Sequence, residues 1–402
     1  MNGFLSKLSE NAASPIREET ALAEELAKSG KQVIRLNSGD PPKYFKTPEY
    51  ITKAYAAALK QNKTFYADSQ GVPELRDAIS KYYKQRYNAN IEPESILVTQ
   101  GVSEALYFIN AALINPQDKA VIARPYYASY LPFLRILGGM AVFADGDEEG
   151  QWAIDTDKLR RLMRSNRKAK YLLFSTPSNP TGSILSRKEM KELVDLANEH
   201  DMLIISDEIY DEIIFGKAKF TSIAQIAKGV PYAILNGASK SFDATGFRIG
   251  YMLLPNQDKK SEALLKRAID LARMRLSANT PAQHAIASVM NTKEHAMHVK
   301  KLARDIEARV KFAARAINKS EYMRTVEPQG GFYVFPKLDM RHLNINDDRE
   351  FANKLLREKY VWLTRGSGFG APGHVRMVAL PEKDVLAEAI ERIEEFCKEH
   401  SR

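Results

Sequence analysis

The chain has 402 residues, a net charge of +9, 44% hydrophobic residues and 27% charged residues. A chain of this length is too long to fold around one small core, so we expect two domains. The single cysteine, Cys397, excludes a disulfide framework and a cysteine-rich metal site and favours a reducing, cytoplasmic compartment. No apolar run approaches the roughly 20 residues of a membrane helix, and we expect no targeting peptide. The lysines are spread without a basic cluster, so we expect neither a nucleic acid nor a membrane as a partner.

The N-terminal stretch SPIREETALAEELAKSG predicts a helix over residues 14–30. Ser14 is placed as its N-cap, Pro15 in the first turn and Gly30 at the end. We expect this segment to pack on the smaller of the two domains.

Residues 95–255 alternate short apolar runs with longer amphipathic stretches. Apolar strands without polar alternation belong to a sheet covered on both faces, and intervening helices make that sheet largely parallel. The expected fold class is therefore α/β. Ligands bind beyond the carboxyl ends of such strands, so functional residues should follow the runs. The runs are ILVT (96–99), AVIA (120–123), YLLFS (171–175), LIIS (203–206), AILN (233–236) and IGYMLL (249–254), with helices between several of them, such as 103–113 and 187–200.

The pattern changes beyond residue 257. Long helical segments lead into three short apolar runs, which predicts a smaller α+β domain. The helices are expected at 259–275, 294–317, 349–358 and 382–399, and the runs are FYVFP (332–336), VWLT (361–364) and VRMVAL (375–380).

TQGVSEAL (99–106) joins a strand end, a glycine turn and a helix start. Backbone N–H groups of Gly101, Val102 and Ser103 would point at an anion there, with the helix dipole behind them. A plain strand–helix turn is the structural alternative.

TPSNPTG (176–182) brackets Asn179 between two prolines, which hold its amide in place. A merely structural turn competes with a ligand-binding role. The Asn179–Pro180 bond is a candidate cis peptide.

LIISDEIYDEIIFG (203–216) places Asp207 and Glu208 directly after a buried strand. A carboxylate there can cap a helix; the functional alternative is an acid aimed at a positively charged ring nitrogen. Tyr210 can turn its hydroxyl toward the same ligand.

RPYYASY (124–130) offers Tyr127 as a stacking surface for a flat ring, although aromatic clusters are usually core. NGASKSFDATGFRIGY (236–251) contains Lys240 and Arg248. Lys240 is either an ordinary turn cation or a reactive amine. Burial near other cations would bring its pKa from about 10.4 toward neutrality and make it a usable nucleophile and base.

Together these stretches supply an anion cradle, a ring-stacking aromatic, a carboxylate, an amide donor and a reactive amine, which is the inventory of a pyridoxal phosphate site. The chain also resembles the fold-type I, class I/II aminotransferases over nearly its whole length, from 34–42 to 375–380. IRLNSGDPP and RMRLSANTPAQ look most like the alanine aminotransferase branch. The motifs that carry the resemblance, in family order, are YADSQGVPELRDAI, TPSNPTG, SDEIYDEIIFG and SKSFDATGFRIGY.

This resemblance implies a seven-stranded sheet in a large domain at 46–290 that binds pyridoxal 5'-phosphate. A small domain would occupy 291–402, with the segment 1–45 packed on it. The implied activity is amino transfer from an L-amino acid, alanine first and aspartate next, to a 2-oxo acid such as 2-oxoglutarate. The implied assembly is a homodimer with shared active sites, and no metal is implied.

The resemblance also implies a role for each matching catalytic or ring-binding residue. Lys240 matches the lysine that binds the cofactor covalently and later carries the substrate Cα proton. Asp207 matches the acid that keeps the pyridine nitrogen protonated, and Tyr127 matches the aromatic stacked on the ring. Asn179 and Tyr210 match the donors to the phenolic oxygen of the ring.

Other matches concern the phosphate and the substrate. Tyr66 matches a tyrosine that reaches the phosphate of the neighbouring subunit. Arg376, with Asn179, matches the group that binds the substrate α-carboxylate, a bidentate task for which arginine is suited. Gly39 matches a glycine whose backbone closes over the substrate. The phosphate grip matches Gly101, Val102, Ser103 and Arg248.

Two departures from the family pattern stand out. Gly237 occupies a position where many relatives carry a phosphate-binding serine; either Ser239 compensates, or the grip is weaker by one hydrogen bond, about 1 kcal/mol. Relatives that prefer dicarboxylates use a second cation at the side-chain end of the substrate, and Arg273 and Arg275 lie in a suitable region.

Three other functions are alternatives to this one. A pyridoxal-phosphate β-lyase or an aromatic or broad-specificity aminotransferase would use the same fold, and a lyase would release ammonia without an oxo-acid acceptor. A non-enzymatic regulator usually carries an added DNA-binding module, and we expect none in the short N-terminal segment. The glycine run GSGFG (366–370) precedes a strand and lacks the dinucleotide-binding pattern.

Overall fold

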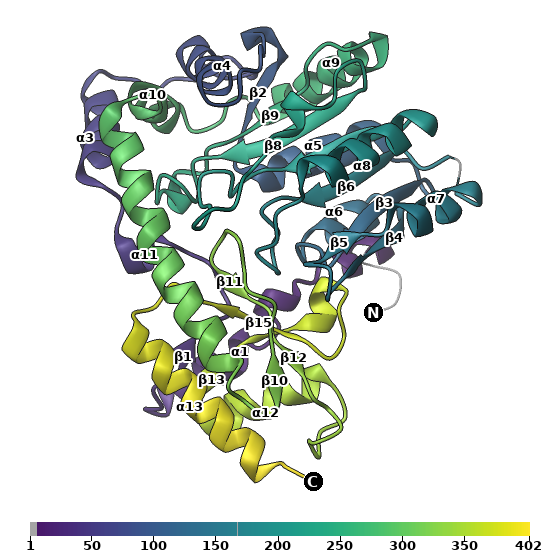
Figure 1. Ribbon diagram of the computed structural model, residues 1–402. Coiled ribbons are helices and arrows are strands. Elements are labelled where there is room, and N and C mark those ends of the chain that lie inside the picture. Colours follow the sequence, from purple (N-terminus) through teal and green to yellow (C-terminus); the bar gives the residue numbers. More distant parts are fainter. Residues whose placement is uncertain (1–5, 167) are drawn as a thin grey trace.

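The computed structural model describes residues 6–166 and 168–402, and these contain a central sheet of eight strands (Figure 1). The strand order is β2-β9-β8-β7-β6-β3-β4-β5. The five strands from β8 to β4 are parallel, whereas β9 is antiparallel to both neighbours and β5 to β4. The predicted α/β fold is confirmed, and the two-residue β5 adds an eighth strand to the seven expected. The strands are β2 (Ile96–Thr99), β3 (Lys119–Arg124), β4 (Met140–Asp147), β5 (Ala153–Ile154), β6 (Tyr171–Ser175), β7 (Leu203–Asp207), β8 (Tyr232–Gly237) and β9 (Gly250–Leu253).

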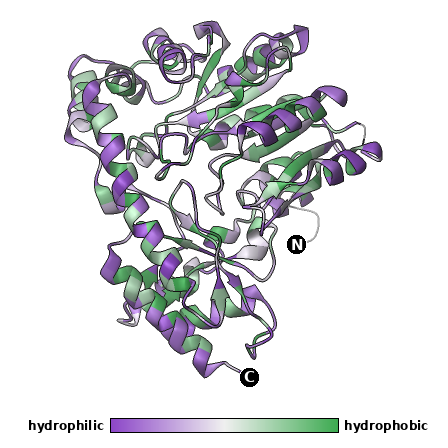
Figure 2. Cartoon of the chain, in the orientation of Figure 1, coloured by the Kyte–Doolittle hydropathy of each residue, from purple (hydrophilic) through white to green (hydrophobic). Residues whose placement is uncertain are grey.

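The central strands are buried on both faces of the sheet. Alternate side chains of a strand point to opposite faces, so Ile204 and Ile234 join one apolar cluster while Ile205 and Leu235 join another. Figure 2 shows the hydrophobic strands between helices with hydrophilic outer sides. This two-sided burial explains why the runs lack polar alternation. One face is covered by α3 (Glu49–Lys60), α4 (Pro73–Tyr87), α7 (Thr156–Arg164), α8 (Arg187–Glu199) and α10 (Thr280–Val289), and the other by α5 (Val102–Leu113), α6 (Tyr130–Arg135) and α9 (Lys259–Met274).

The long helix α11 (Lys293–Ile317) runs from the helices beside the sheet to a second core (Figure 1). There its C-terminal half packs with two further helices and short strands. These two further helices, at Asp348–Lys359 and Lys383–Glu399, lie where the sequence predicts them. The domain boundaries at 45 and 290 stay predictions. The further elements are α12 (Asp348–Lys359), α13 (Lys383–Glu399), the sheet β11 (Tyr333–Val334), β15 (Val375–Val378) and β14 (Thr364–Arg365), and the pairs β1 (Ile34–Arg35) with β13 (Val361–Trp362) and β10 (Met323–Arg324) with β12 (Lys337–Leu338).

The N-terminal helix is shorter than predicted. The α-helix α1 spans Thr20–Lys28, and Ser14 precedes only a 3-10 turn, η2 (Pro15–Arg17), without a capping bond from its side chain. The turn lies against β14, and this tertiary contact outweighs the local capping signal. Gly30 has a φ of +83° just after the helix end, as its predicted role requires. α1 itself packs on α12 and β13.

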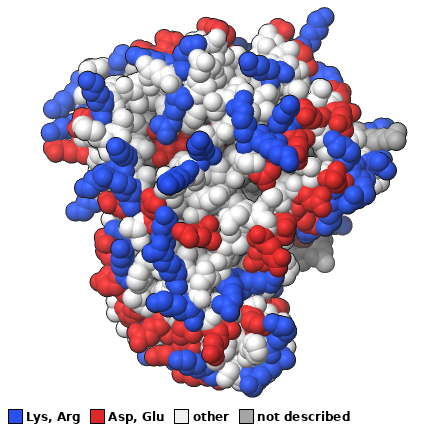
Figure 3. Space-filling view, in the orientation of Figure 1, with Lys and Arg blue, Asp and Glu red and all other residues white. Residues whose placement is uncertain are grey.

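The surface carries both signs of charge. Figure 3 shows Lys and Arg interspersed with Asp and Glu on the visible face. Within the two described ranges, no helix has the length and apolarity needed to cross a bilayer.

Candidate active site

A cavity of about 680 Å³ lies at the carboxyl ends of the parallel strands. The position is the one expected for ligands of such sheets. Two residues expected at the site, Gly101 and Tyr66, do not line the cavity. The predicted residues that do line it are Gly39, Val102, Ser103, Tyr127, Asn179, Asp207, Tyr210, Ser239, Lys240, Arg248 and Arg376.

The N-terminus of α5 forms one end of this cavity. Gly101 precedes the helix with a φ of +78°, which favours glycine, and its N–H donates to the carbonyl oxygen two residues earlier. In the first turn, the N–H groups of Val102 and Ser103 have no intrahelical acceptor. Arg248 lies against the turn: a Cβ on Gly101 would be 2.3 Å from its Nη2. Free N–H groups beside a guanidinium form a place for a phosphate.

Lys240 follows β8, with its amine enclosed in the cavity wall. Its Nζ donates to the carbonyl oxygen of Gly39 at 2.9 Å and lies 5.4 Å from the centre of the Phe332 ring. Burial lowers the pKa of Lys240 to about 8; Asp40 opposes this shift, and Arg376 and Arg248 reinforce it. Part of the amine is therefore neutral at physiological pH, which a nucleophile or base requires.

We expect Lys240 of the cofactor-free protein to react with acetic anhydride at a rate that rises with pH around a midpoint near 8. A lowered pKa means that the reactive neutral amine appears as the pH rises past 8, well before the value of about 10.4 for a solvated lysine. Mass spectrometry of the peptide containing Lys240 measures the labelling, with peptides of exposed lysines as internal references. A midpoint above 10 would contradict the lowered pKa.

Asp207 ends β7, and its carboxylate accepts two hydrogen bonds. Tyr130 donates from its hydroxyl at 2.7 Å, and the N–H of Ile209 donates at 3.2 Å. Burial raises the pKa of Asp207 to about 6 despite these donors. Glu208 is also buried but accepts from two serine hydroxyls and a backbone N–H outside the cavity. Of the two candidate carboxylates, Asp207 alone lines the cavity.

Arg376, Asn179 and Tyr210 meet around Tyr333. The hydroxyls of Tyr210 and Tyr333 are 2.8 Å apart, and the Asn179 amide donates weakly to Tyr333 at 3.4 Å. Arg376 donates from Nη1 to Asn179 Oδ1 at 2.9 Å and from Nη2 to the carbonyl oxygen of Asn37. Its buried Nε has no partner among the described residues. A buried guanidinium with an unused N–H is suited to a carboxylate ligand.

Two of the glycines are required by close contacts. A Cβ on Gly39 would lie 2.3 Å from the Phe332 ring. A Cβ on Gly237 would lie 2.6 Å from the carbonyl oxygen of Ile249 and 2.7 Å from the Cα of Gly250. The antiparallel strands β8 and β9 thus leave no room for a side chain at position 237, while Ser239 lines the cavity two residues later.

The two tyrosines predicted to contact the cofactor differ in position. Tyr127 lines the cavity and packs edge-on against Tyr130, with ring centres 5.5 Å apart. Tyr66 is 77% exposed. Tyr66 therefore points to solvent in a single subunit.

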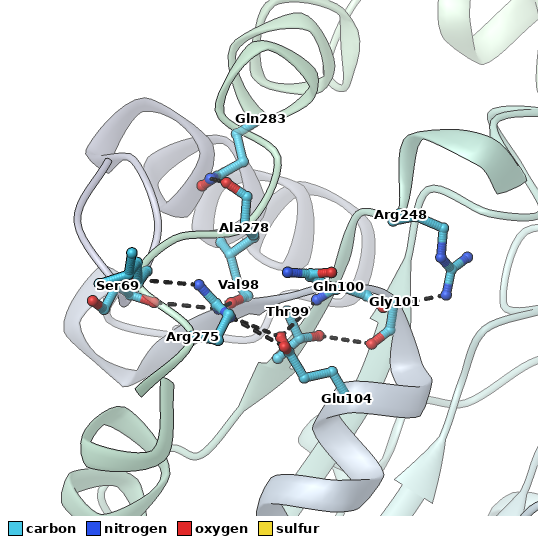
Figure 4. Close-up of polar contacts among 11 residues, drawn as sticks. Ser69, Val98, Thr99, Gln100, Gly101, Glu104, Arg248, Arg275, Ala278 and Gln283 are labelled. Atoms are coloured by element: carbon cyan, nitrogen blue, oxygen red, sulfur yellow. Dashed lines mark hydrogen bonds and ion pairs between the residues drawn. The ribbon is translucent and has the colours of Figure 1, made fainter. Parts of the chain in front are cut away.

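Arg273 and Arg275 both lie outside the cavity lining. Arg275 pairs with Glu104 at 3.0 Å and donates to the carbonyl oxygen of Val98 at 2.7 Å (Figure 4). Arg273 is exposed and pairs with Asp270 at 2.7 Å. Arg275 thus joins α5 to β2, and within the described residues of one subunit neither arginine reaches the cavity where a substrate side chain would lie.

Several residues at the site were missed from the sequence. Tyr130 lies in RPYYASY and Tyr333 in FYVFP, but no local signal in the sequence separates either of them from core aromatics. Asp40 and Arg17 line the cavity from the N-terminal region. Both residues lie far along the chain from the strand ends, so the sequence does not predict that they line the same cavity.

The candidate cis peptide was assigned to the wrong proline. The Thr176–Pro177 bond is cis, as is Arg124–Pro125, and Asn179–Pro180 is not among the cis bonds of the described chain. The sequence contains two prolines in this loop and does not distinguish them.

The residues present fit pyridoxal phosphate. The α5 N-terminus and Arg248 would hold the phosphate, Tyr127 the ring face, Asp207 the ring nitrogen and Lys240 the aldehyde carbon. Arg248 lies so close to Gly101 that a side chain there would collide with it, and this contact places a guanidinium beside the N-terminus of α5.

Comparisons with known proteins identify the family of the chain. The family model described as aminotransferase class I and II matches residues 31–393. The chain is 34% identical to the aspartate aminotransferase of Bacillus subtilis over 95% of each chain. It is 31% identical to the glutamate–pyruvate aminotransferase of Haemophilus influenzae, over 96% of this chain and 95% of that one. An alanine aminotransferase structure from Pyrococcus furiosus superposes with a TM-score of 0.93 at 35% identity, over 98% of this chain and 100% of that one.

Proposed function

Since the chain belongs to the aminotransferase class I and II family, we propose that it uses pyridoxal 5'-phosphate to transfer an amino group from an L-amino acid to a 2-oxo acid. The preferred donor is alanine, then aspartate, and the acceptor is 2-oxoglutarate. The observation that carries the proposal is the buried Lys240 amine, with its pKa lowered to about 8, in one cavity with Asp207.

When bound, pyridoxal phosphate supplies an electron-accepting ring that stabilises negative charge developing at the substrate Cα. Arg376 binds the α-carboxylate and so orients the Cα–H bond. Lys240, once its amine is free and neutral, accepts the Cα proton and later returns it. Asp207, held by Tyr130, keeps a proton on the ring nitrogen through charge and hydrogen bonding. Asn179 and Tyr210 donate to the phenolic oxygen.

A panel of amino donors with 2-oxoglutarate tests the proposed reaction. We expect the cofactor spectrum to change with alanine, aspartate and glutamate in half-reactions, and a 2-oxo acid to form in equal amount to the amino group transferred. Release of ammonia and product without any oxo-acid acceptor would instead establish the alternative, a β-lyase. Faster turnover of aromatic donors than of alanine would establish an aromatic or broad-specificity aminotransferase.

We also propose a homodimer with shared active sites. Tyr66 is 77% exposed, and neighbouring large apolar side chains are exposed too: Phe65 by 57% and Met274 by 82%. The segment that contains Phe65 and Tyr66 adjoins the segment that follows Met274, because the hydroxyl of Thr280 donates to the carbonyl oxygen of Phe65 at 2.9 Å. Exposed aromatic and methionine side chains gathered in this way are typical of a protein interface.

We expect sedimentation to show a dimer and Tyr66→Phe to weaken binding of pyridoxal phosphate by about 10-fold, the cost of one hydrogen bond to a charged oxygen. The dimer itself should persist in this variant, because only a hydroxyl is lost. A fully active monomer would contradict the shared site.

A cytoplasmic location is part of the same proposal. The single cysteine, Cys397, is buried and unpaired. This fits a reducing compartment.

A further inference from the structure

The residues that would hold a substrate come from both cores of the molecule. Arg376 lies on β15 of the second core, whereas Asn179 follows β6 of the central sheet and Lys240 follows β8. Arg376 donates to Asn179 Oδ1 at 2.9 Å across this junction. The affinity for an α-carboxylate therefore depends on how β15 is held against the sheet.

The hairpin formed by β4 and β5, at the edge of the central sheet, makes one contact of this kind (Figure 1). Glu148 lies between the two strands of the hairpin. Its Oε1 is 3.3 Å from Nε2 of His374, and its Oε2 is 3.0 Å from Nζ of Lys337. His374 directly precedes β15 and Lys337 begins β12. One carboxylate thus joins the hairpin to two strands of the second core.

His374 is enclosed between this hairpin and its own core. Its ring stacks on the Phe335 ring, with centres 5.0 Å apart and an angle of 12° between the planes. It also meets Trp152 of the hairpin edge-on at 5.5 Å. Trp152 has a backbone φ of +63°, in the left-handed region that a bulky residue rarely adopts. Local backbone strain is thus tolerated where the hairpin meets the second core.

The GSGFG run, which no other role explains, supports the same junction. The N–H of Gly366 donates to the carbonyl oxygen of His374 at 2.7 Å, and a Cβ on Gly366 would lie 2.5 Å from that oxygen. The Phe369 ring lies 4.6 Å from the guanidinium of Arg376. The carbonyl oxygen of Phe369 accepts from the N–H of Tyr126, which follows β3, at 3.0 Å. The run therefore packs on both His374 and Arg376 and ties them to the sheet.

His374 and Arg376 are two residues apart in extended chain, so their side chains point to the same side. The backbone at His374 pairs with Lys337 in an isolated antiparallel bridge, which continues the extended chain of β15. On that side His374 meets Glu148, and Arg376 meets Asn179. A change at the contact with the hairpin would therefore displace both side chains together relative to the central sheet.

On the basis of the proposed function, we propose that Glu148 is a positioning residue, which through His374 seats β15 so that Arg376 meets the substrate α-carboxylate. Glu148 does not line the cavity, so it acts through Arg376 and not by contact with the substrate. Burial alone would raise the pKa of Glu148, but His374 and Lys337 hold that pKa below its ordinary value. The carboxylate therefore stays charged at neutral pH and keeps its two partners.

The binding of two matched ligands tests this role. 2-Methylalanine carries an α-carboxylate but no Cα proton, so it binds without turnover, and isopropylamine is the same amine without the carboxylate. We expect Glu148→Gln to weaken binding of 2-methylalanine to the cofactor-loaded protein about 3- to 30-fold, the usual size of a coupling through packed residues. Binding of isopropylamine should change less than about twofold, because it has no carboxylate for Arg376. The cofactor absorbance measures both affinities.

Three further variants separate positioning from a general effect on the fold. Glu149→Gln removes an exposed carboxylate from the same turn and should change neither affinity. Glu148→Asp keeps the charge on a shorter side chain and should restore part of the loss. The double variant of Glu148→Gln and His374→Gln should lose no more affinity than Glu148→Gln alone, because the two residues act through one contact.

The outcomes distinguish this inference from the proposed function. Unchanged binding of 2-methylalanine by Glu148→Gln, or an equal loss of affinity for both ligands, would overturn the role of Glu148 alone. A wild type that binds isopropylamine as tightly as 2-methylalanine would instead overturn the proposed role of Arg376, and this inference with it.

Discussion

Lys240→Ala is expected to lower kcat/KM for amino transfer by about 1,000-fold or more, because one amine acts both as nucleophile and as proton carrier. The folded structure should survive. Burial lowers the pKa of Lys240 to about 8. At pH 7 the buried, protonated amine therefore decreases the free energy of unfolding, and its removal eliminates this penalty. Steady-state kinetics with alanine and 2-oxoglutarate, together with thermal unfolding, measure both expectations.

Two further variants decide whether the amine or merely its charge matters. Lys240→Arg keeps a positive charge but cannot become neutral near pH 8, so it should be as inactive as the alanine variant. Lys217→Ala removes an exposed lysine away from the cavity and should leave the rate unchanged. Near-normal turnover by Lys240→Ala would rule out the proposed role of Lys240.

Asp207→Asn should reduce kcat by about 100- to 1,000-fold, the usual effect of removing one preorganised electrostatic partner. Asparagine has the shape of aspartate and can still accept from Tyr130, which lies 2.7 Å from the carboxylate. It carries no charge, however, and so cannot hold a proton on the ring nitrogen. KM should change much less than kcat, since Asp207 does not contact the substrate carboxylate in the proposed arrangement.

The control variants for Asp207 separate charge from position. Asp207→Glu keeps the carboxylate but displaces it by one methylene, and should retain more activity than the asparagine variant. Tyr130→Phe removes only the hydrogen bond that orients Asp207, and should cost about 10-fold. Wild-type kinetics in Asp207→Asn would refute the role of the carboxylate.

The prediction from sequence succeeded where the physical signal was local. The apolar runs predicted β2, β3, β6, β7, β8 and β9 because a strand buried on both faces must be apolar throughout. The same rule placed Lys240 and Asp207 at strand ends, where a parallel sheet binds its ligands. The apolar runs do not predict the strand β4, since its sequence MAVFADGD ends in polar residues and the strand is half-buried.

The choice between Asp207 and Glu208 shows what the residue pattern alone does not predict. Both are buried carboxylates after one strand. Their side chains diverge, because successive residues near a strand end point in opposite directions, and the residue types alone do not say which side faces the cavity. The family resemblance selected Asp207, and the contacts of Glu208 with serine hydroxyls now supply the physical reason.

The sequence by itself determined the alternation of strands and helices, the two-core plan and the chemical groups at the strand ends, because burial and hydrogen bonding impose those patterns on neighbouring residues. Only the tertiary structure decided which distant groups share the cavity. It brought Arg17 to the wall that Arg376 shares and committed Arg275 to Glu104. Such contacts join segments up to several hundred residues apart, and they depend on how the two cores close on each other rather than on any local pattern.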